Sequence, residues 1–429
     1  MSPHVIVLGL GTAGAAVAAC CARRGLRVSG VDSKALDATG ARWVNGVPGW
    51  AFDAAGLPRP EAPELLGGSV PYHLVAGWDG PRMTSTSVLE VDMRALTARL
   101  LDDARARGAT LHGNTRVRRI DDHLVQLDGA GPDTLQGGVI VDATGLAGLG
   151  LLRVRPEPRE DLCVAEQGVF SIADPAGAAA FLARHQVREQ EVVCFTGVAG
   201  AYSIANLRVH GDEVGVLTGS LPGLGFASGV ELMRTVREAH PWIGERRYGG
   251  SRAIPLGRPL DVVGWGRRVA IGDAANMVWA PHGSGIAQQL LAAELLAHTL
   301  AEGGDPWSFN VAWQRRYGAL LASADLLRRG TSRLDPGWLP AMIRRRILSP
   351  ELAADAMVQR PTRPPPRALL RAARGLAREP RVARAIVPAL LRGLLLEAHY
   401  RRYPERPSGL LAWRAQRRRV DGSWRVGSP

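Results

Sequence analysis

The sequence is poor in the residues that form covalent cross-links or cysteine-based metal sites. Its four cysteines form no CxxC pair, which argues against a disulfide framework and a zinc site and favours a reducing, cytoplasmic location. Aromatic residues make up 5% of the 429 positions, and Lys34 is the single lysine. With 46% hydrophobic and 22% charged residues, the composition excludes a largely disordered or collagen-like chain. A chain of this length predicts a soluble globular enzyme of about two or three domains.

Long uncharged runs are scarce, and the one at residues 5–22 does not fit a secretory signal. Only His4 precedes it in place of a basic region, and glycines at positions 9, 11 and 14 interrupt it. We interpret this run as a strand, a turn and a helix. No other uncharged stretch has the length of a membrane span.

The net charge of +13 comes from one end of the chain. Residues 301–429 hold 25 arginines against 10 acidic residues, whereas residues 1–300 are close to neutral. This segment is expected to be helical, with a linker or kink at the prolines of residues 361–366. Its basic character indicates either a solvated surface or contact with an anionic membrane surface or an acidic carrier protein. A competing interpretation is that its leucines pack against the other domains as a lid. No nucleic-acid-binding module is recognisable, so we expect no nucleic-acid partner.

The first motif has every part of a dinucleotide-binding βαβ unit. Residues 4–9 predict an apolar strand, residues 15–24 a helix, and residues 27–32 a second strand that ends in an acid. The glycines between strand and helix allow a tight turn, a close approach of pyrophosphate and close packing of the helix. An acid at the second strand favours FAD or NAD over NADP, and a glycine turn without a ligand is the alternative. The predicted cofactor-binding residues here are Gly9, Gly11, Thr12, Ala13, Gly14, Asp32 and Ser33.

Two further motifs lie downstream. Residues 138–142 predict a strand that ends in the sequence from Asp142 to Gly145. Residues 268–272 predict another strand, followed by Asp273, a glycine-rich loop and a helix over residues 287–300. An aspartate at a strand end can bind a ribityl hydroxyl, and a helix N-terminus can stabilise negative charge on a flavin ring. An ordinary strand–loop–helix unit is the alternative. The candidates from these motifs are Asp142, Gly145, Gly272, Asp273, Pro281, Gly283, Gly285 and Ile286.

Together the three motifs resemble those of the para-hydroxybenzoate hydroxylase fold group of FAD enzymes. That group includes aromatic hydroxylases, flavin-dependent halogenases, geranylgeranyl reductases and lycopene cyclases. The sequence Arg-Ala-Ile-Pro-Leu at residues 252–256, and Gly285-Ile286 followed by two glutamines, are similar to the geranylgeranyl reductase-like branch. The loop at residues 276–281 is similar to that of lycopene cyclases.

The resemblance implies an α/β fold: a Rossmann-type FAD/NAD(P)-binding domain with three ββα layers, an inserted α+β substrate domain and a C-terminal helical segment. The FAD domain would comprise residues 1–40, 90–160 and 255–305, and the substrate domain residues 41–89 and 161–254, followed by a helical basic region at 306–429. Strands are expected at residues 163–172, 192–196, 201–209 and 213–218, and helices at 91–107, 175–185 and 229–240. Many members place an arginine at the start of the helix that is predicted here at residues 91–107. Arg94 is the candidate for it, although the leucine spacing of those members puts the expected position at Met93.

The resemblance also implies non-covalent FAD and an oxidoreductase. NAD(P)H would bind transiently, or a flavin reductase or other redox partner would supply electrons, because no second dinucleotide motif is recognisable. The favoured reaction reduces an unsaturated small molecule, isoprenoid-like or a natural product. Open alternatives are O₂-dependent hydroxylation, a non-redox cyclisation of the lycopene type, and a degenerate flavin fold that acts as a scaffold. Catalytic residues stay open, with His282, Trp279 and Tyr202 as candidates. Peripheral membrane association is a further expectation.

Overall fold

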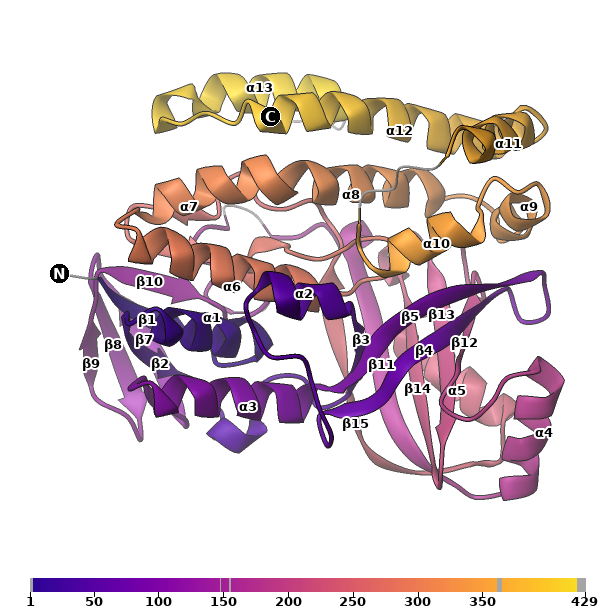
Figure 1. Cartoon of the computed structure of the whole chain (residues 1–429), viewed down its shortest axis with the longest axis horizontal. Helices are drawn as coiled ribbons and strands as arrows, with labels where there is room; N and C mark the ends of the chain where they lie inside the picture. Colours follow the sequence, from indigo (N-terminus) through magenta and orange to yellow (C-terminus); the bar gives the residue numbers. More distant parts are fainter. Residues whose placement is uncertain (1–2, 147, 154–155, 361–364, 423–429) are drawn as a thin grey trace.

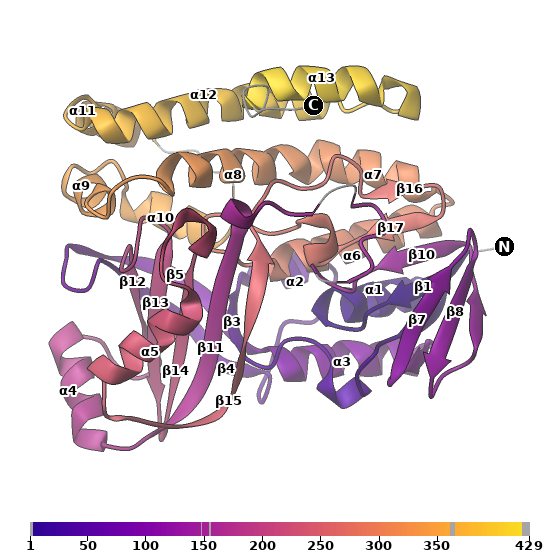
Figure 2. The same cartoon turned by 180° about the vertical axis from the view of Figure 1, so that it is seen from behind.

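A computed structural model describes residues 3–146, 148–153, 156–360 and 365–422 (Figure 1). Residues 361–364 of the predicted linker lie outside this part. Two sheets stand side by side, and the C-terminal helices cover both in two further layers (Figures 1 and 2).

The first sheet has six strands in the order β16-β17-β10-β1-β2-β6. The central strands are parallel, as β1 pairs with both β10 and β2, and only the short β16 is antiparallel. The first strand is apolar and buried on both sides, which is typical of a parallel sheet covered on both faces. The strands are β1 (His4–Leu8), β2 (Arg27–Val31), β6 (Thr110–His112), β10 (Val139–Asp142), β16 (Gly264–Trp265) and β17 (Arg268–Ala270).

Different layers cover the two faces of this sheet. On one face lie the helices α1 (Thr12–Arg23), α3 (Met93–Ala106) and α6 (Ile286–Ala301). On the other lies a three-stranded sheet of β7 (Thr115–Ile120), β8 (Leu124–Gly129) and β9 (Thr134–Gln136). Ile6 and Leu8 of β1 pack there against Val125 and Leu127. The predicted three-layer ββα arrangement is confirmed.

The second sheet has eight strands in the order β15-β11-β14-β13-β12-β4-β5-β3. Helices α4 (Pro175–His185) and α5 (Gly229–Ala239) contribute Phe181 and Met233 to the apolar cluster on one face. A parallel pair between β12 and β4 joins two segments that are far apart in sequence, with Val192 opposite Tyr72. The strands are β3 (Val44–Val47), β4 (Leu65–Ala76), β5 (Arg82–Asp92), β11 (Leu162–Ile172), β12 (Val192–Thr196), β13 (Ser203–His210), β14 (Glu213–Ser220) and β15 (Ile243–Pro255).

The C-terminal segment is helical, as predicted. Its inner layer continues from α6, and its outer layer consists of α11, α12 and α13 (Figures 1 and 2). Tyr400, Tyr403 and Trp413 of the outer layer are buried in one cluster with Leu396. Within the described ranges, no helix is long and apolar enough to cross a membrane. The helices of this segment are α7 (Pro306–Trp313), α8 (Ala319–Thr331), α9 (Trp338–Arg344), α10 (Pro350–Met357), α11 (Pro366–Ala377), α12 (Pro380–Arg401) and α13 (Leu410–Asp421). A short π-helix at Gln314–Gly318 joins α7 to α8. One further short helix, α2 (Gly49–Ala54), lies outside this segment.

Most predicted elements lie where the sequence pattern put them, and the differences have local causes. The predicted bounds of α4 and β12 agree with the structure. Helix α3 begins at Met93, two residues later than predicted, because β5 continues to Asp92. The Asp92 carboxylate caps the helix by accepting a hydrogen bond of 2.8 Å from the Arg94 backbone N–H.

Candidate functional site

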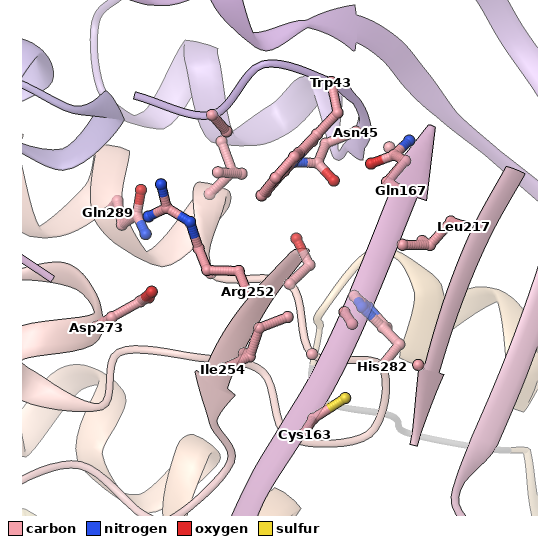
Figure 3. A pocket seen from close by; sticks show the side chains of 18 of the residues that line it. Trp43, Asn45, Cys163, Gln167, Leu217, Arg252, Ile254, Asp273, His282 and Gln289 are labelled. Carbon is pink, nitrogen blue, oxygen red and sulfur yellow. The ribbon is translucent and has the colours of Figure 1, made fainter. Parts of the chain in front are cut away.

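One cavity of about 1010 Å³ extends between the two sheets and the C-terminal helices. It collects residues from all three sequence motifs and continues along β11, β14 and β15 of the second sheet (Figure 3). The predicted residues that line it are Gly9, Gly11, Thr12, Ala13, Asp32, Ser33, Gly145, Asp273, Pro281, Gly283, Gly285, Ile286, His282 and Tyr202.

The junction of β1 and α1 requires glycine at two positions, one in the turn and one in the first turn of the helix. Gly9 has φ +86°, and a Cβ there would lie 2.7 Å from the Ala143 carbonyl oxygen. A Cβ on Gly14 would lie 1.8 Å from the Gly9 carbonyl oxygen, so this glycine lets the helix contact the turn. Gly11 is the N-cap of α1, and no side chain caps the helix. The first N–H groups of α1 therefore point to the cavity, where an anionic phosphate would satisfy them.

Asp32 follows β2 and lines the same end of the cavity. Its carboxylate accepts hydrogen bonds from the backbone N–H groups of Leu10, at 2.7 Å, and of Lys34, at 2.9 Å. These bonds fix the orientation of the carboxylate beside the glycine turn. Such a fixed acceptor next to a helix N-terminus suits a ribose whose phosphate lies on that helix.

A second helix N-terminus faces the cavity at α6. Its N-cap is Gly285, again without a capping side chain. The preceding loop is closed by hydrogen bonds of 2.9 Å from the Trp279 N–H to the Ser284 carbonyl and from the Gly283 N–H to the Trp279 carbonyl. Gly283 has φ +72°, which favours glycine in this tight loop. An electron-rich ring edge would be stabilised at this helix end.

Arg252 is a site residue that the motif analysis used only as a marker of the reductase-like branch. It projects from β15 toward Gln289 and Asp273 (Figure 3), and its guanidinium carbon lies 5.6 Å from the centre of the Trp43 ring. Burial raises the pKa of Asp273, and the positive charges of Arg252 and Arg153 oppose this rise. The position of Arg252 on a strand just before the Gly-Asp motif was the only signal in the sequence.

Some predicted residues support the site without lining it. The buried Asp142 accepts hydrogen bonds from Thr144, through its N–H at 3.1 Å and its hydroxyl at 2.6 Å, and from the Leu151 N–H at 3.0 Å. It thereby fixes the turn that carries Gly145. A Cβ on Gly272 would lie 3.0 Å from the Ala13 Cβ, so this glycine allows close packing on α1.

Two further predicted residues, Arg94 and Trp279, lie outside the cavity lining. Arg94 does not line the cavity, because its guanidinium pairs with Asp92, at 2.7 Å, and stacks over the Tyr248 ring, at 4.1 Å. Thr97, one turn further along α3, lies closer to the glycine turn, with its hydroxyl 3.5 Å from that of Thr12. Trp279 is also outside the cavity lining and instead closes the loop before α6.

His282 and Tyr202 do line the cavity. Nε2 of His282 is buried and has no hydrogen-bond partner among the described residues. Burial lowers the pKa of His282 to about 4, against the opposing effect of the backbone at Ala356 and Met357, so the ring is neutral at pH 7. The Tyr202 hydroxyl donates a hydrogen bond of 2.8 Å to the Ala280 carbonyl.

The far end of the cavity is formed by the C-terminal helices, which the sequence analysis connected to the other domains only through the alternative of a lid. Their contribution is mainly apolar. No motif marks these residues, and only the fold brings them against the second sheet. They are Leu327, Trp338, Leu339, Met342, Leu348, Ala353, Ala356, Met357 and Ile386.

These features fit FAD, which consists of an adenosine, a pyrophosphate, a ribityl chain and a flavin ring. Asp32 and the N-terminus of α1 match the adenosine and pyrophosphate. Asp273 and the N-terminus of α6 match the ribityl chain and the flavin ring. Gly11 leaves space for the pyrophosphate, because a side chain at this position would project into the cavity. Its Cβ would lie 3.5 Å from the Gly40 Cα.

The layers, the two uncapped helix ends and the cavity fit an FAD-dependent oxidoreductase, and the fold is that of the group that the motifs resemble. Over 389 residues it is 24% identical to the digeranylgeranylglycerophospholipid reductase of Sulfolobus acidocaldarius, a match that covers 81% of each chain. Its fold is similar to that of a geranylgeranyl bacteriochlorophyll reductase-like protein from Thermoplasma acidophilum. That match has a TM-score of 0.69 and 14% identity, and it covers 89% of this chain and 97% of the other.

A flavin-dependent brominase also shares the fold, with a TM-score of 0.63 and 13% identity over 83% of this chain and 93% of the other. No family model matches the chain. The resemblance to the reductase-like branch is confirmed by the first two similarities.

Proposed function

We propose that this protein is an FAD-dependent reductase that hydrogenates a carbon–carbon double bond in a largely apolar, isoprenoid-like substrate. The observation that carries the proposal is the continuity of the cavity. The end that fits the flavin leads without interruption into an end lined by leucine, methionine and tryptophan side chains. An apolar chain bound there would have its double bonds beside the flavin. The sequence similarity to a reductase of a geranylgeranylated phospholipid supports this choice.

The charges at the apolar end favour an uncharged substrate portion. Arg328 lines this end, but the carboxylates of Asp161 and Asp325 neutralise its guanidinium. The remaining polar groups along the second sheet include the neutral Asn206 side chain. Such neutral groups can orient a hydroxyl or carbonyl of a substrate but would not hold a phosphate.

Bound FAD would supply the hydride for such a reduction, and the chain's own residues would bind and orient the substrate. His282 lines the cavity as a neutral ring whose Nε2 is enclosed by protein atoms, so this side chain would shape the cavity wall beside the substrate. Tyr202 fixes the loop that carries His282 through its bond to Ala280. Arg252 places a positive charge near the flavin end.

The reductant is proposed to be NAD(P)H that binds transiently, or a flavin reductase that delivers electrons. The six-stranded sheet with its glycine turn is the one dinucleotide-binding unit in the described part of the chain, since the eight-stranded sheet is mostly antiparallel. This arrangement supports a nicotinamide cofactor that visits the site instead of residing in a domain of its own. We also propose a cytoplasmic location, which the four free cysteines support.

The second candidate function is an O₂-dependent monooxygenase, which is favoured by the shared fold of monooxygenases. One such structure, PqsL of Pseudomonas aeruginosa, described as a probable FAD-dependent monooxygenase, has a TM-score of 0.55 and 18% identity over 77% of this chain. A non-redox cyclisation is a third. The three candidates differ in what they consume, because reduction needs electrons without O₂, hydroxylation needs both, and cyclisation has no net demand for either.

The deciding experiment incubates the FAD-loaded protein with a geranylgeranylated glycerophospholipid or an aromatic probe, under nitrogen and in air, with NAD(P)H. The proposal expects lipid product heavier by two hydrogen atoms per reduced bond, formed under nitrogen, with matching NAD(P)H consumption. Product that carries oxygen and forms only in air would replace reduction by hydroxylation. An isomer formed without NAD(P)H consumption would replace it by cyclisation.

A further inference from the structure

The outer surface of α12 carries an unusual concentration of exposed apolar side chains. Of the eleven large apolar side chains that are exposed in the described part of the chain, eight lie between Leu369 and Leu411. Five of these form the surface that we call the α12 outer face: Val387, Leu390, Leu391, Leu394 and Leu395. Leu394 is 67% exposed and Leu391 58%. Exposed patches of contiguous leucines generally mark an interaction site.

The position of α12 explains why its two sides differ. The helix belongs to the outermost layer of the molecule (Figures 1 and 2). Val382, Ile386 and Leu396 point inward and are at most 5% exposed, because they pack on the helical layer beneath. The outward positions recur at intervals of three and four residues, which places them on one side of a helix.

Arginines border the α12 outer face. With 100° of rotation for each residue, Arg384 and Arg402 fall on the same side as Leu391, before and after the leucines. Arg381 and Arg392 lie to one side of this line, and all of these arginines are exposed. Arg381, Arg384 and Arg402 form no ion pair with any described residue. Their charges are therefore available to an external partner.

We propose that the α12 outer face docks on the surface of an anionic lipid bilayer. The leucines would enter the boundary between head groups and acyl chains, and the bordering arginines would contact lipid phosphates. Helix α12 would lie parallel to the bilayer, since no described helix is long and apolar enough to span it. Exposed leucines on α11 and α13, Leu369, Leu370 and Leu411, add apolar area to the same layer.

A second copy of the chain is a less suitable occupant of this face. In a two-fold symmetric contact between antiparallel α12 helices, Arg384 of one copy would approach Arg402 of the other. In a parallel contact each of these arginines would meet its own counterpart. Like charges that are brought together in a buried contact are destabilising. An anionic surface instead neutralises all of them.

The inner side of α12 links this surface to the candidate active site. Ile386 lines the apolar end of the cavity together with Leu327 and Met342. The apolar end thus lies one helix away from the proposed bilayer contact. This link rests on the proposed function, because it would let a lipid substrate pass between the bilayer and the cavity. The docking itself does not depend on it.

The experiment measures co-sedimentation of the full chain with vesicles of phosphatidylglycerol and, separately, of phosphatidylcholine. We expect binding to the anionic vesicles at low salt that falls steeply at high salt. The double variant Leu391→Glu/Leu394→Glu should weaken binding at least tenfold. The variant Arg384→Gln/Arg402→Gln should weaken it by about fivefold for each arginine removed. The matched control is Val230→Glu, which changes an exposed apolar residue on α5 and should bind as the wild type does.

Circular dichroism and the FAD content of each variant check that the fold is intact. No binding to anionic vesicles at low salt, or binding that the leucine variant leaves unchanged, would overturn the proposal. Light scattering tests the alternative of a second copy. If the wild type forms a dimer that the leucine variant abolishes, and no vesicle binding is seen, the α12 outer face is a contact between two copies and the proposal is overturned. Reduction of a detergent-dispersed substrate is a separate readout. A leucine variant that still reduces the dispersed substrate but no longer binds vesicles would support both the docking and the proposed function. A wild-type protein that binds vesicles but reduces no substrate would contradict the proposed function alone.

Discussion

The Tyr202 hydroxyl, on the segment that leads into β13, donates a hydrogen bond of 2.8 Å to the Ala280 carbonyl in the loop before α6. This bond joins the second sheet to the loop that presents Pro281, His282 and Gly283 to the cavity. Burial raises the pKa of Tyr202 well above its ordinary value, so the hydroxyl stays protonated and can donate. The geometry of the loop before α6 therefore depends on the second sheet.

Tyr202→Phe removes this donor and leaves the buried Ala280 carbonyl without it. We expect a loss of about 1 kcal/mol in the free energy of unfolding and FAD binding weakened a few-fold. Urea denaturation and fluorescence titration with FAD measure both quantities. Tyr248→Phe is the control, because that ring stacks under Arg94 outside the cavity. Equal stability and equal FAD affinity in Tyr202→Phe and wild type would contradict the role given to this bond.

His282 predicts a specific dependence of stability on pH. Because its pKa falls from about 6.5 in the unfolded chain to about 4 in the fold, the unfolded state takes up a proton first as the pH drops. The contribution of the neutral ring to the free energy of unfolding is complete above pH 6.5 and is lost as the pH falls toward 4. Between pH 7 and pH 5 this costs up to about 2 kcal/mol.

His282→Gln should remove that part of the acid sensitivity, so its unfolding free energy should fall less between pH 7 and pH 5 than that of the wild type. The control is His123→Gln, which changes a surface histidine and should keep the wild-type slope. Parallel pH profiles of the wild type and His282→Gln would show that the ring is not held neutral.

Arg328 holds the C-terminal segment against the second sheet. Its guanidinium on α8 is buried between Asp161, which precedes β11, and Asp325. Arg328→Met would leave the two buried carboxylates with less positive charge to neutralise them. We therefore expect a loss of about 3–5 kcal/mol in the free energy of unfolding. Urea denaturation measures it, with the exposed Arg344→Met as the control. A loss below 1 kcal/mol, roughly that of a surface ion pair, would contradict this assignment.

Halogenation is not expected, although a brominase shares the fold. Halogenases of this fold group use an active-site lysine, and the single lysine here, Lys34, lines the cavity beside Asp32 at the end assigned to adenosine. Reduced FAD, halide and O₂ should give no chlorinated or brominated product by mass spectrometry. A halogenated product that disappears in Lys34→Ala would refute this prediction.

Local patterns in the sequence sufficed for the nucleotide-binding half of the site, because strand, glycine turn, helix and acid are neighbours in the chain. They do not show how neighbours compete for a side chain: Asp92 caps α3 and pairs with the Arg94 guanidinium, which lies outside the cavity lining. They also do not show which remote segments come into contact. The hairpin of β4 and β5 pairs with β12 more than a hundred residues away, and Ile386 reaches the cavity only through the packing of α12. No periodicity encodes such pairings.

The central claim, that the cavity holds FAD on the glycine turn of α1, is tested most directly by FAD affinity in Gly11→Val. The change should not disturb folding, because a Cβ at Gly11 meets only the Gly40 backbone, at 3.5 Å or more, but its side chain would occupy the space of the pyrophosphate. Gly68→Val, at an exposed position with nothing within 4 Å, is the control. Fluorescence titration should give tight binding to the wild type and Gly68→Val and at least a hundredfold loss in Gly11→Val, with unchanged circular dichroism. Wild-type FAD affinity in a folded Gly11→Val protein would contradict the account.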